Sequence, residues 1–376
     1  MRTKIESVET ILWDKWLILK IVCEDGTIGI GEGGVHGWQK PTKTAIDTMG
    51  EYLIGKDPYL IEHHYQFLYR SSHFMGSVIQ GALSAIDIAL WDIKGKRLNA
   101  PIWDLLGGKV RNKVRAIAQG VNGKTPEEFA EKVNSLKEKG FTAVKFTPMP
   151  SDWPKYTYSK LMDVSTNIVK AVRNKVGVDF DIAIEIHRNM RPHEAIVFCN
   201  EIEKYKPYFV EDPIVPDSVL SMSNLSSKIN LPLAVGERNA GIWEFKEYAE
   251  LVNPGFFKPD IAVAGGITGV KKISDIAQAH HIKICPHNFQ SPIATAACIS
   301  VAVSSHAWDV QESVDEDLSP RRDITDQVIK LKDGWYYPSE KPGLGVNFNE
   351  GSVKKHPFIQ ANSPPEIKDD GSVALN

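Results

Sequence analysis

The sequence predicts an α/β protein, a (β/α)8-type barrel with an N-terminal α+β capping domain completed by the C-terminal segment. Three observations support this fold class. The first third of the chain combines a hairpin pattern with a long amphipathic helix, eight β-rich runs then alternate with helical runs, and the last stretch is aromatic and turn-rich. The expected domains are residues 1–113 (capping), 114–330 (barrel) and 331–376, which return to the capping domain.

The N-terminal region begins with a predicted hairpin. Two β-rich runs are joined by Glu24-Asp25-Gly26 in the stretch KWLILKIVCEDGTIGIGEG, and residues 1–60 as a whole are expected to form strands and turns. Between residues 76 and 100 the pattern changes to apolar residues three and four apart, which predicts a long helix with one buried face. These apolar positions are Leu83, Ile86, Leu90 and Ile93.

The barrel is predicted from eight β-rich runs separated by helical ones. The runs are residues 114–120, 141–148, 179–187, 208–213, 231–237, 255–263, 281–287 and 307–312. In the first intervening helix, Thr125 is a candidate N-cap, Pro126 suits the first helical position and Glu128 completes a capping box. Gly140 can end that helix. The helix after the eighth strand has the least regular pattern.

Composition limits the function classes. Hydrophobic residues make up 42% and charged residues 24% of the chain, as in ordinary globular proteins, and a net charge of −3 offers no basic surface for nucleic acid. No apolar run is long enough to span a membrane, and the polar start MRTKIESVETILWDKW is unlike a signal peptide. We therefore expect a cytoplasmic protein without nucleic-acid or membrane partners. Its four cysteines lack disulfide spacing, which suits a reducing compartment.

Ionisable residues close most of the predicted barrel strands. They are Lys145, Glu185 with His187, Glu211, Glu237, Asp260, His287 and Glu312. Parallel barrel strands end on one rim, where active sites form, so we expect these side chains to converge. The spacing supports this, because 26 residues separate Glu185 from Glu211 and again Glu211 from Glu237. Since residues two apart on a strand share a face, Glu185 and His187 are expected to point into the barrel together.

Three of these carboxylates predict a metal centre. Glu185, Glu211 and Glu237 would repel one another in a desolvated site unless a cation neutralised them. Their hard oxygen ligands suit Mg²⁺. Any one of them alone would be read as a solvated loop charge, whereas three at neighbouring strand ends favour the metal.

A histidine and an aspartate predict a general base. Asp260 ends the sixth strand and His287 the seventh, and a carboxylate partner fixes the tautomer of an imidazole and raises its basicity. A purely structural His–Asp hydrogen bond is the alternative. A Cys285–His287 nucleophile pair is disfavoured because a strand-buried cysteine is usually inert, and no further soft ligands support zinc.

The N-terminal loops carry candidate substrate contacts. The stretch GIGEGG at residues 29–34 lacks the following helix of a βαβ unit, so it does not predict a phosphate loop. His36 and Trp38 are candidate substrate-facing loop residues, although for Trp38 taken alone a packed tryptophan is the favoured interpretation. Arg188 is a further candidate on the barrel rim.

At these residues the chain resembles the mandelate racemase subgroup of the enolase superfamily. The segments that carry the resemblance follow in family order over nearly the whole chain. They are GIGEGGVHGW, SAIDIALWDIKGKRLNAPIWDLLGG, TAVKF, EIHR, VEDP, VGER, KPD, CPHNFQSP and KPGLGV. Within the subgroup the chain is most similar to the dehydratases of galactonate, gluconate and arabinonate. The resemblance implies an enzyme of carbohydrate catabolism that forms homo-oligomers.

The resemblance also implies residue roles. It assigns the metal to the three glutamates and the base to the His–Asp pair above. Glu312 matches the acid that hydrogen-bonds the substrate carboxylate, and His187 matches the leaving-group acid of galactonate-type dehydratases. Two positions depart from the family pattern. The first metal ligand is usually Asp, where this chain has Glu185. Racemases carry Lys-x-Lys on the second barrel strand, where Lys145 is here followed by Thr147, which disfavours a two-base racemase.

The implied reaction is a Mg²⁺-dependent dehydration of an aldonate. His287 would remove the C2 proton, Lys145 and Glu312 would stabilise the enediolate, and His187 would protonate the departing C3 hydroxyl, giving a 2-keto-3-deoxy sugar acid. Two alternatives stay open: an epimerase or cycloisomerase of a sugar acid, for example an anhydro-galactonate, and a non-catalytic barrel that binds a sugar acid. Specificity is expected near residues 13–40 and 70–76.

Overall fold

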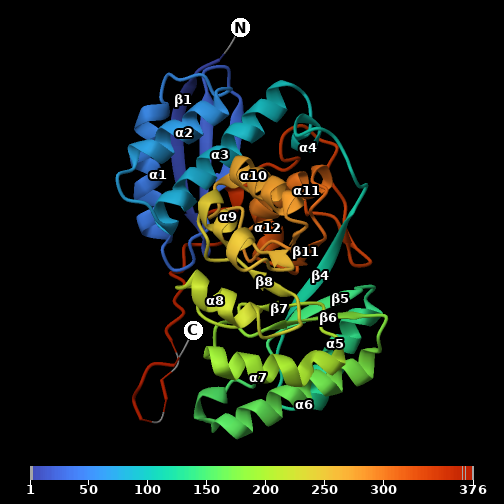
Figure 1. Ribbon diagram of the computed structural model, residues 1–376. Coiled ribbons are helices and arrows are strands. Elements are labelled where there is room, and N and C mark those ends of the chain that lie inside the picture. Colours follow the sequence, from blue (N-terminus) through green and yellow to red (C-terminus); the bar gives the residue numbers. More distant parts are fainter. Residues whose placement is uncertain (1–2, 366, 369, 375–376) are drawn as a thin grey trace.

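A computed structural model describes residues 3–365, 367–368 and 370–374. A three-stranded antiparallel sheet with its helices lies against a helix-covered barrel (Figure 1). The sheet consists of β1 (Ile5–Trp13), β2 (Trp16–Cys23) and β3 (Ile28–Glu32). Its helices are α1 (Gln39–Leu53), α2 (Ile61–Ser71), α3 (Ser77–Arg97) and the short α4 (Ile102–Leu105).

The N-terminal predictions are partly confirmed. β2 and β3 form the predicted hairpin, and the predicted long helix is α3. The expectation of one buried face is wrong, because every residue from 80 to 90 is buried where α3 packs between the sheet and the barrel. The expectation of strands and turns throughout residues 1–60 is wrong, because α1 occupies 39–53. Its buried residues Ile46, Met49 and Leu53 are three and four apart, so a helical period was present in the sequence.

Glycines in β3 allow the strand to lie directly on α3. A Cβ on Gly29 would lie 2.2 Å from the carbonyl oxygen of Ala89, and one on Gly31 would lie 2.0 Å from that of Ala85. Only residues without a side chain fit this approach. The glycine-rich stretch therefore serves strand–helix packing, which agrees with the rejection of a phosphate loop.

The barrel contains one strand in each of the eight predicted runs. The strands are β4 (Val114–Val121), β5 (Ala143–Phe146), β6 (Asp181–Glu185), β7 (Val210–Glu211), β8 (Leu233–Val235), β9 (Phe256–Phe257), β10 (Lys283–Ile284) and β11 (Val310–Ser313). From β4 to β10 each pairs in parallel with the next, and β11 pairs with β4. A parallel bridge between Ile284 and Trp308 joins β10 to the residues leading into β11, so the pairing runs around a ring.

Helices cover the outside of the barrel. They are α5 (Pro126–Glu138), α6 (Tyr158–Val176), α7 (Pro192–Ile202), α8 (Val219–Ser226), α9 (Ile242–Leu251), α10 (Gly266–Ala279), α11 (Pro292–Ser304) and α12 (Arg321–Ile324), with 3-10 turns at Trp153–Lys155, Glu203–Tyr205 and Glu350–Ser352. Thr125 caps α5 as predicted, but the Glu128 carboxylate accepts the N–H of Lys124, one residue before the N-cap. α12 has only four residues, which agrees with the irregular eighth unit.

The C-terminal segment contacts both the barrel and the N-terminal sheet. A hairpin of β12 (Leu331–Lys332) and β13 (Trp335–Tyr336) pairs antiparallel with β4. Further on, the Trp13 indole N–H donates to the Ser352 hydroxyl at 2.8 Å. This segment therefore ties the two halves of the molecule together.

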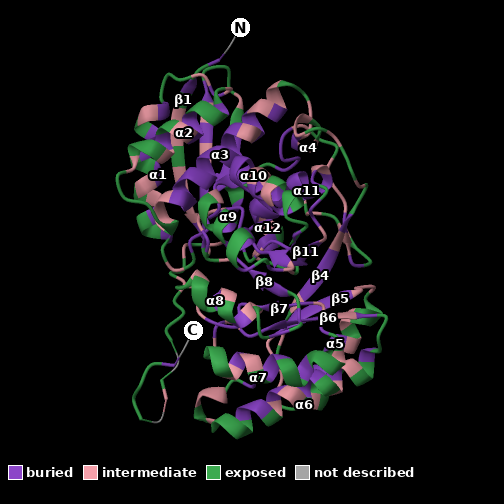
Figure 2. Cartoon of the chain, in the orientation of Figure 1, coloured by how far each residue is buried: buried purple, intermediate pink, exposed green. Residues whose placement is uncertain are grey.

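The lower barrel interior is closed by a layer of apolar side chains. The layer consists of Ile117, Ala143, Ala183, Phe209, Ala234, Phe256, Cys285 and Val310. Figure 2 shows the barrel strands as mostly buried, with exposed residues on the outer helices. The charged residues of the barrel thus lie next to a layer of apolar side chains. In such a low-dielectric environment electrostatic interactions are strong. None of the described helices has the length and apolarity to cross a membrane.

Candidate active site

Three glutamates meet at the carboxyl ends of neighbouring strands. Glu185 ends β6, Glu211 ends β7, and Glu237 lies two residues beyond β8; each offers an oxygen within 4.8 Å of the others. Glu211 is fully buried and Glu185 is 6% exposed. Burial, and then the charge of Glu211, raise the pKa of Glu185 well above its ordinary value. Such a set needs a cation, and its all-oxygen donors fit Mg²⁺.

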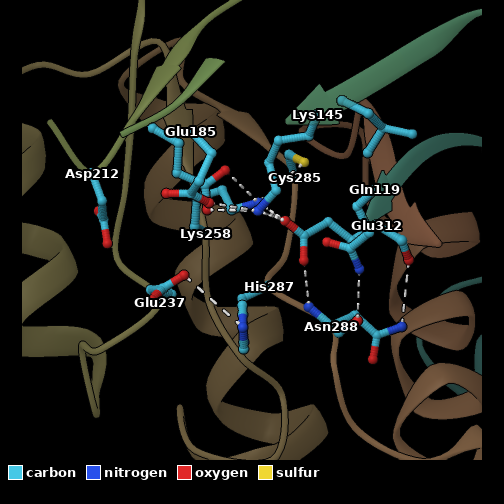
Figure 3. A network of polar contacts seen from close by, with 12 residues as sticks. Gln119, Lys145, Glu185, Asp212, Glu237, Lys258, Cys285, His287, Asn288 and Glu312 are labelled. Atoms are coloured by element: carbon cyan, nitrogen blue, oxygen red, sulfur yellow. Dashed lines mark hydrogen bonds and ion pairs between the residues drawn. The ribbon is translucent and has the colours of Figure 1, made fainter. Parts of the chain in front are cut away.

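Two buried lysines neutralise part of this acidic cluster (Figure 3). Lys145 Nζ lies 2.8 Å from Glu185 Oε2 and 3.1 Å from Glu211 Oε1. Lys258 Nζ lies 3.1 Å from Glu211 Oε2, and both lysines contact Glu312. Burial alone would lower the pKa of Lys145, but its carboxylate neighbours raise it well above the usual value, so the ammonium stays charged.

Lys258 is the main group of the site that the sequence reasoning missed. It is fully buried and lies two residues before Asp260 in the KPD segment. Alternate residues of an extended segment share a face, so the position of Asp260 on the rim was a usable signal for Lys258.

Glu312 lies across the cluster on β11. Its Oε2 accepts the backbone N–H of Asn288 at 2.7 Å, and Gln119 Nε2 donates to the Asn288 carbonyl at 3.2 Å. Burial raises the pKa of Glu312, but Lys145 and Lys258 together hold it far below the ordinary value. Glu312 is thus an ionised carboxylate that lies between the ammonium groups of Lys145 and Lys258.

His287 and Asp260 form a close pair beside the glutamates. His287 Nδ1 lies 2.8 Å from Asp260 Oδ2, while its Nε2 faces Glu237 Oε2 at 4.0 Å (Figure 3). Burial lowers the pKa of His287, but Glu237 and the hydrogen bond to Asp260 outweigh it and raise the pKa to about 9. In turn, His287 and Arg188 overcome the effect of burial on Glu237 and lower its pKa to about 2.

The turn after β6 departs from the sequence prediction. β6 ends at Glu185, and His187 and Arg188 have left-handed backbones with φ of 55° and 65°. The expectation that Glu185 and His187 share one strand face is therefore wrong, because the chain leaves the extended conformation before His187. Instead the His187 N–H donates to Glu185 Oε1 at 3.0 Å.

Arg188 lies inside the cluster. Its Nη1 is 3.0 Å from Asp212 Oδ2 and also contacts Glu237, and its Nη2 is 2.8 Å from His187 Nε2. An arginine only donates hydrogen bonds, so His187 Nε2 accepts and the neutral ring carries its proton on Nδ1. Burial and the charge of Arg188 lower the pKa of His187 to about 4.

The candidate loop residues lie on the capping side. His36 Nε2 is 3.0 Å from the Ser363 hydroxyl, and Lys15 and His287 are among the charges that, after burial, lower the pKa of His36. His36 is therefore within electrostatic reach of His287. Trp38 is 60% exposed, so the packed tryptophan favoured from the sequence alone is wrong.

Two family models match the chain. Residues 3–107 match the mandelate racemase / muconate lactonizing enzyme N-terminal domain, and residues 128–352 match the enolase C-terminal domain-like family. D-galactonate dehydratase of Cronobacter sakazakii is 33% identical over 369 residues, 96% of each chain. D-galactonate dehydratase of Klebsiella pneumoniae is 34% identical over 346 residues, 90% of each chain.

Solved structures show the same fold. An enolase-superfamily member from Salmonella Typhimurium superposes with a TM-score of 0.90 at 29% identity, covering 94% of this chain and 98% of the other. An enolase from Agrobacterium radiobacter, a candidate galactarate dehydratase with sodium and L-malate bound, superposes with a TM-score of 0.93 at 26% identity, covering 99% and 100%. The predicted barrel with an N-terminal capping domain is thereby confirmed.

Proposed function

The chain belongs to the mandelate racemase subgroup of the enolase superfamily, and on this premise we propose that it is a Mg²⁺-dependent sugar-acid dehydratase acting on an aldonate. One observation carries the proposal. The Glu185–Glu211–Glu237 cluster and the His287–Asp260 pair face each other across the rim, with His287 Nε2 4.0 Å from Glu237 Oε2. A barrel that only binds a sugar acid has no need of an oriented base at this point.

The three glutamates would hold the ion. Bound there, Mg²⁺ would act as a Lewis acid toward the substrate carboxylate and offset the negative charge that develops when C2 loses its proton. Lys145 and Lys258 add two fixed ammonium groups next to the same carboxylates. Since these charges are held in place before reaction, they stabilise the enediolate without reorganisation.

His287 is the proposed base. Asp260 holds a proton on Nδ1, which leaves Nε2 to receive the C2 proton. Of the protein groups around His287, the Glu237 carboxylate raises the pKa of His287 most. A cation at Glu237 would offset that carboxylate and lower the pKa toward neutrality, where a base is most effective.

His187 is the proposed acid for the C3 hydroxyl, and its contacts set a condition on that role. Its Nε2 accepts from Arg188, and a neutral imidazole is a poor acid. The role therefore requires substrate binding to release Arg188 or to place the hydroxyl near Nδ1. The same observation favours a second candidate function, an epimerase of a sugar acid. His287 would remove the C2 proton and a donor on the opposite face of C2 would return one, so no hydroxyl leaves and no leaving-group acid is needed. A cycloisomerase that opens an anhydro ring would still have to protonate the departing ring oxygen.

The test is a panel of aldonates incubated with Mg²⁺ in D₂O, read by C2 deuteration and by 2-keto-3-deoxy product. We expect product from at least one member, C2 exchange without product in His187→Asn, and neither in His287→Asn. Near-native turnover of His287→Asn would exclude His287 as the base.

The remaining outcomes separate the candidate functions. Full product formation by His187→Asn would exclude His187 as the acid, and exchange without elimination in the native enzyme would favour the epimerase. Neither exchange nor product with any member would favour a sugar-acid-binding barrel.

A further inference from the structure

A glutamine lies directly behind the His287–Asp260 pair. Gln290 Nε2 donates to Asp260 Oδ2 at 2.8 Å, the same oxygen that faces His287 Nδ1 at 2.8 Å. The other oxygen, Asp260 Oδ1, accepts the N–H of Ala262 at 2.8 Å. The carboxylate is therefore held at both oxygens, and Gln290 is the side chain that fixes the one used by the base.

The chain around Gln290 is itself held firmly. The buried Arg321 donates from Nη1 to the Gln290 carbonyl and is paired with Glu316 at 3.0 Å. The next residue, Ser291, donates its N–H to Glu32 Oε1 at 2.9 Å. Gln290 is 8% exposed. A buried side chain on a clamped backbone is suited to orienting a neighbour.

Gln290 also touches the capping domain. Its Nε2 donates to the Gly34 carbonyl at 2.8 Å, and the Gly34 N–H donates to the Ala262 carbonyl at 3.0 Å. A Cβ on residue 34 would lie 2.4 Å from Gln290 Nε2. Gly34 lies in the loop between β3 and α1, which carries His36 and Trp38. One amide thus joins the base to the loop in which substrate contacts are expected.

We propose that Gln290 is a positioning residue of this site: its amide sets the orientation of Asp260, and hence of His287, and makes that orientation depend on the docked capping loop at Gly34. The inference rests on the proposed function for its kinetic consequence but not for its geometry. Gln290 acts through Asp260 and needs no contact with substrate.

The kinetic test compares three variants. Gln290→Met keeps the length of the side chain and removes the donor; we expect kcat and C2 exchange to fall ~10–100-fold, with KM changed less than about twofold. Gln290→Glu is expected to be worse, because a carboxylate cannot donate and repels Asp260. Gln327→Met is the matched control: Gln327 also donates to a glycine carbonyl, that of Gly345, in the C-terminal segment. A role in filling space alone predicts the same kcat for Gln290→Met as for Gln327→Met.

Gly34 supplies an independent perturbation. Gly34→Ala places a methyl group where the Gln290 amide lies, so it should reproduce the loss of kcat. The added methyl group would also lie 2.7 Å from the Ala262 Cβ. Because Gly34→Ala already displaces the Gln290 amide, Gly34→Ala/Gln290→Met should be slower than Gly34→Ala by less than the full loss caused by Gln290→Met alone. Additive losses would overturn the coupling of the loop to the base.

A spectroscopic readout separates this inference from the proposed function. In the Mg²⁺-loaded protein the His287 Nδ1–H should give a downfield proton resonance that disappears in His287→Asn. We expect Gln290→Met to speed its exchange with water several-fold and Gln327→Met to leave it unchanged. An unchanged resonance in Gln290→Met would overturn the positioning role. If the native protein turned over no sugar acid, the proposed function would fail while this measurement still decided the role of Gln290.

Discussion

Replacing Lys258 by Met tests the charge balance of the site most directly. The ammonium group is fully buried, lies 3.1 Å from Glu211 Oε2 and also contacts Glu312. Removing one partner of a buried ion pair typically costs about 3–5 kcal/mol, because the remaining charge stays desolvated. Glu312 keeps Lys145 as a partner, so we expect a loss near the lower limit, ~3 kcal/mol.

The loss can be measured by thermal unfolding with EDTA present. A 376-residue chain has an unfolding entropy of roughly 0.8 kcal/mol/K, so ~3 kcal/mol corresponds to a decrease in Tm of about 4 °C. Adding Mg²⁺ should reduce this difference, because a cation at the glutamates compensates Glu211. Lys246→Met is the matched control, since Lys246 and Glu250 form an exposed helical pair worth about 0.3–0.5 kcal/mol.

Equal Tm values for the two lysine variants would contradict this charge balance. Lys258 would then not be a charged partner of Glu211 and Glu312. A Lys258→Met variant that is destabilised to the same extent with and without Mg²⁺ would instead contradict a cation at Glu211.

Three further predictions concern the metal, the dyad and a buried carboxyl. EDTA should abolish turnover and Mg²⁺ should restore it, as measured by keto-acid formation; activity that survives metal removal would exclude the proposed ion. Asp260→Asn should reduce kcat by about 10⁴-fold at similar KM, because the amide favours the wrong tautomer of His287, and a loss below tenfold in initial-rate assays would contradict the pairing. Burial raises the pKa of Asp87 to about 7, so the folded state binds more protons than the unfolded state between about pH 4 and 7. The free energy of unfolding should therefore fall as pH rises through this range, and urea unfolding of Asp87→Asn should show a weaker fall than the native protein.

The architecture was predictable because it depends on local periodicity. Apolar runs of strand length alternate with amphipathic helices from residue 114 onward, and each predicted run contains a parallel strand. The same periodicity was overlooked in α1, where Ile46, Met49 and Leu53 lie on one face.

Part of the site followed from topology. Once parallel strands form a ring, residues at their carboxyl ends must lie on one rim. This is why Glu185, Glu211, Glu237 and His287, far apart in the chain, lie together. Lys258 could have been predicted in the same way, because it lies two residues before Asp260 in an extended segment and therefore shares its face.

The sequence by itself thus determined the order of strands and helices and which acids and histidines stand at strand ends, since both follow from spacing along one chain. Tertiary structure alone decided how those groups pair. The contact of Arg188 with Asp212 and the position of Gln290 between Asp260 and Gly34 join residues 24 to 256 positions apart. The left-handed turn at His187 and Arg188 depends on a backbone conformation outside the strand. No local pattern encodes such contacts, because each forms between groups that only the folded chain brings together, and the Gln290–Gly34 contact also requires the capping domain to be packed on the barrel.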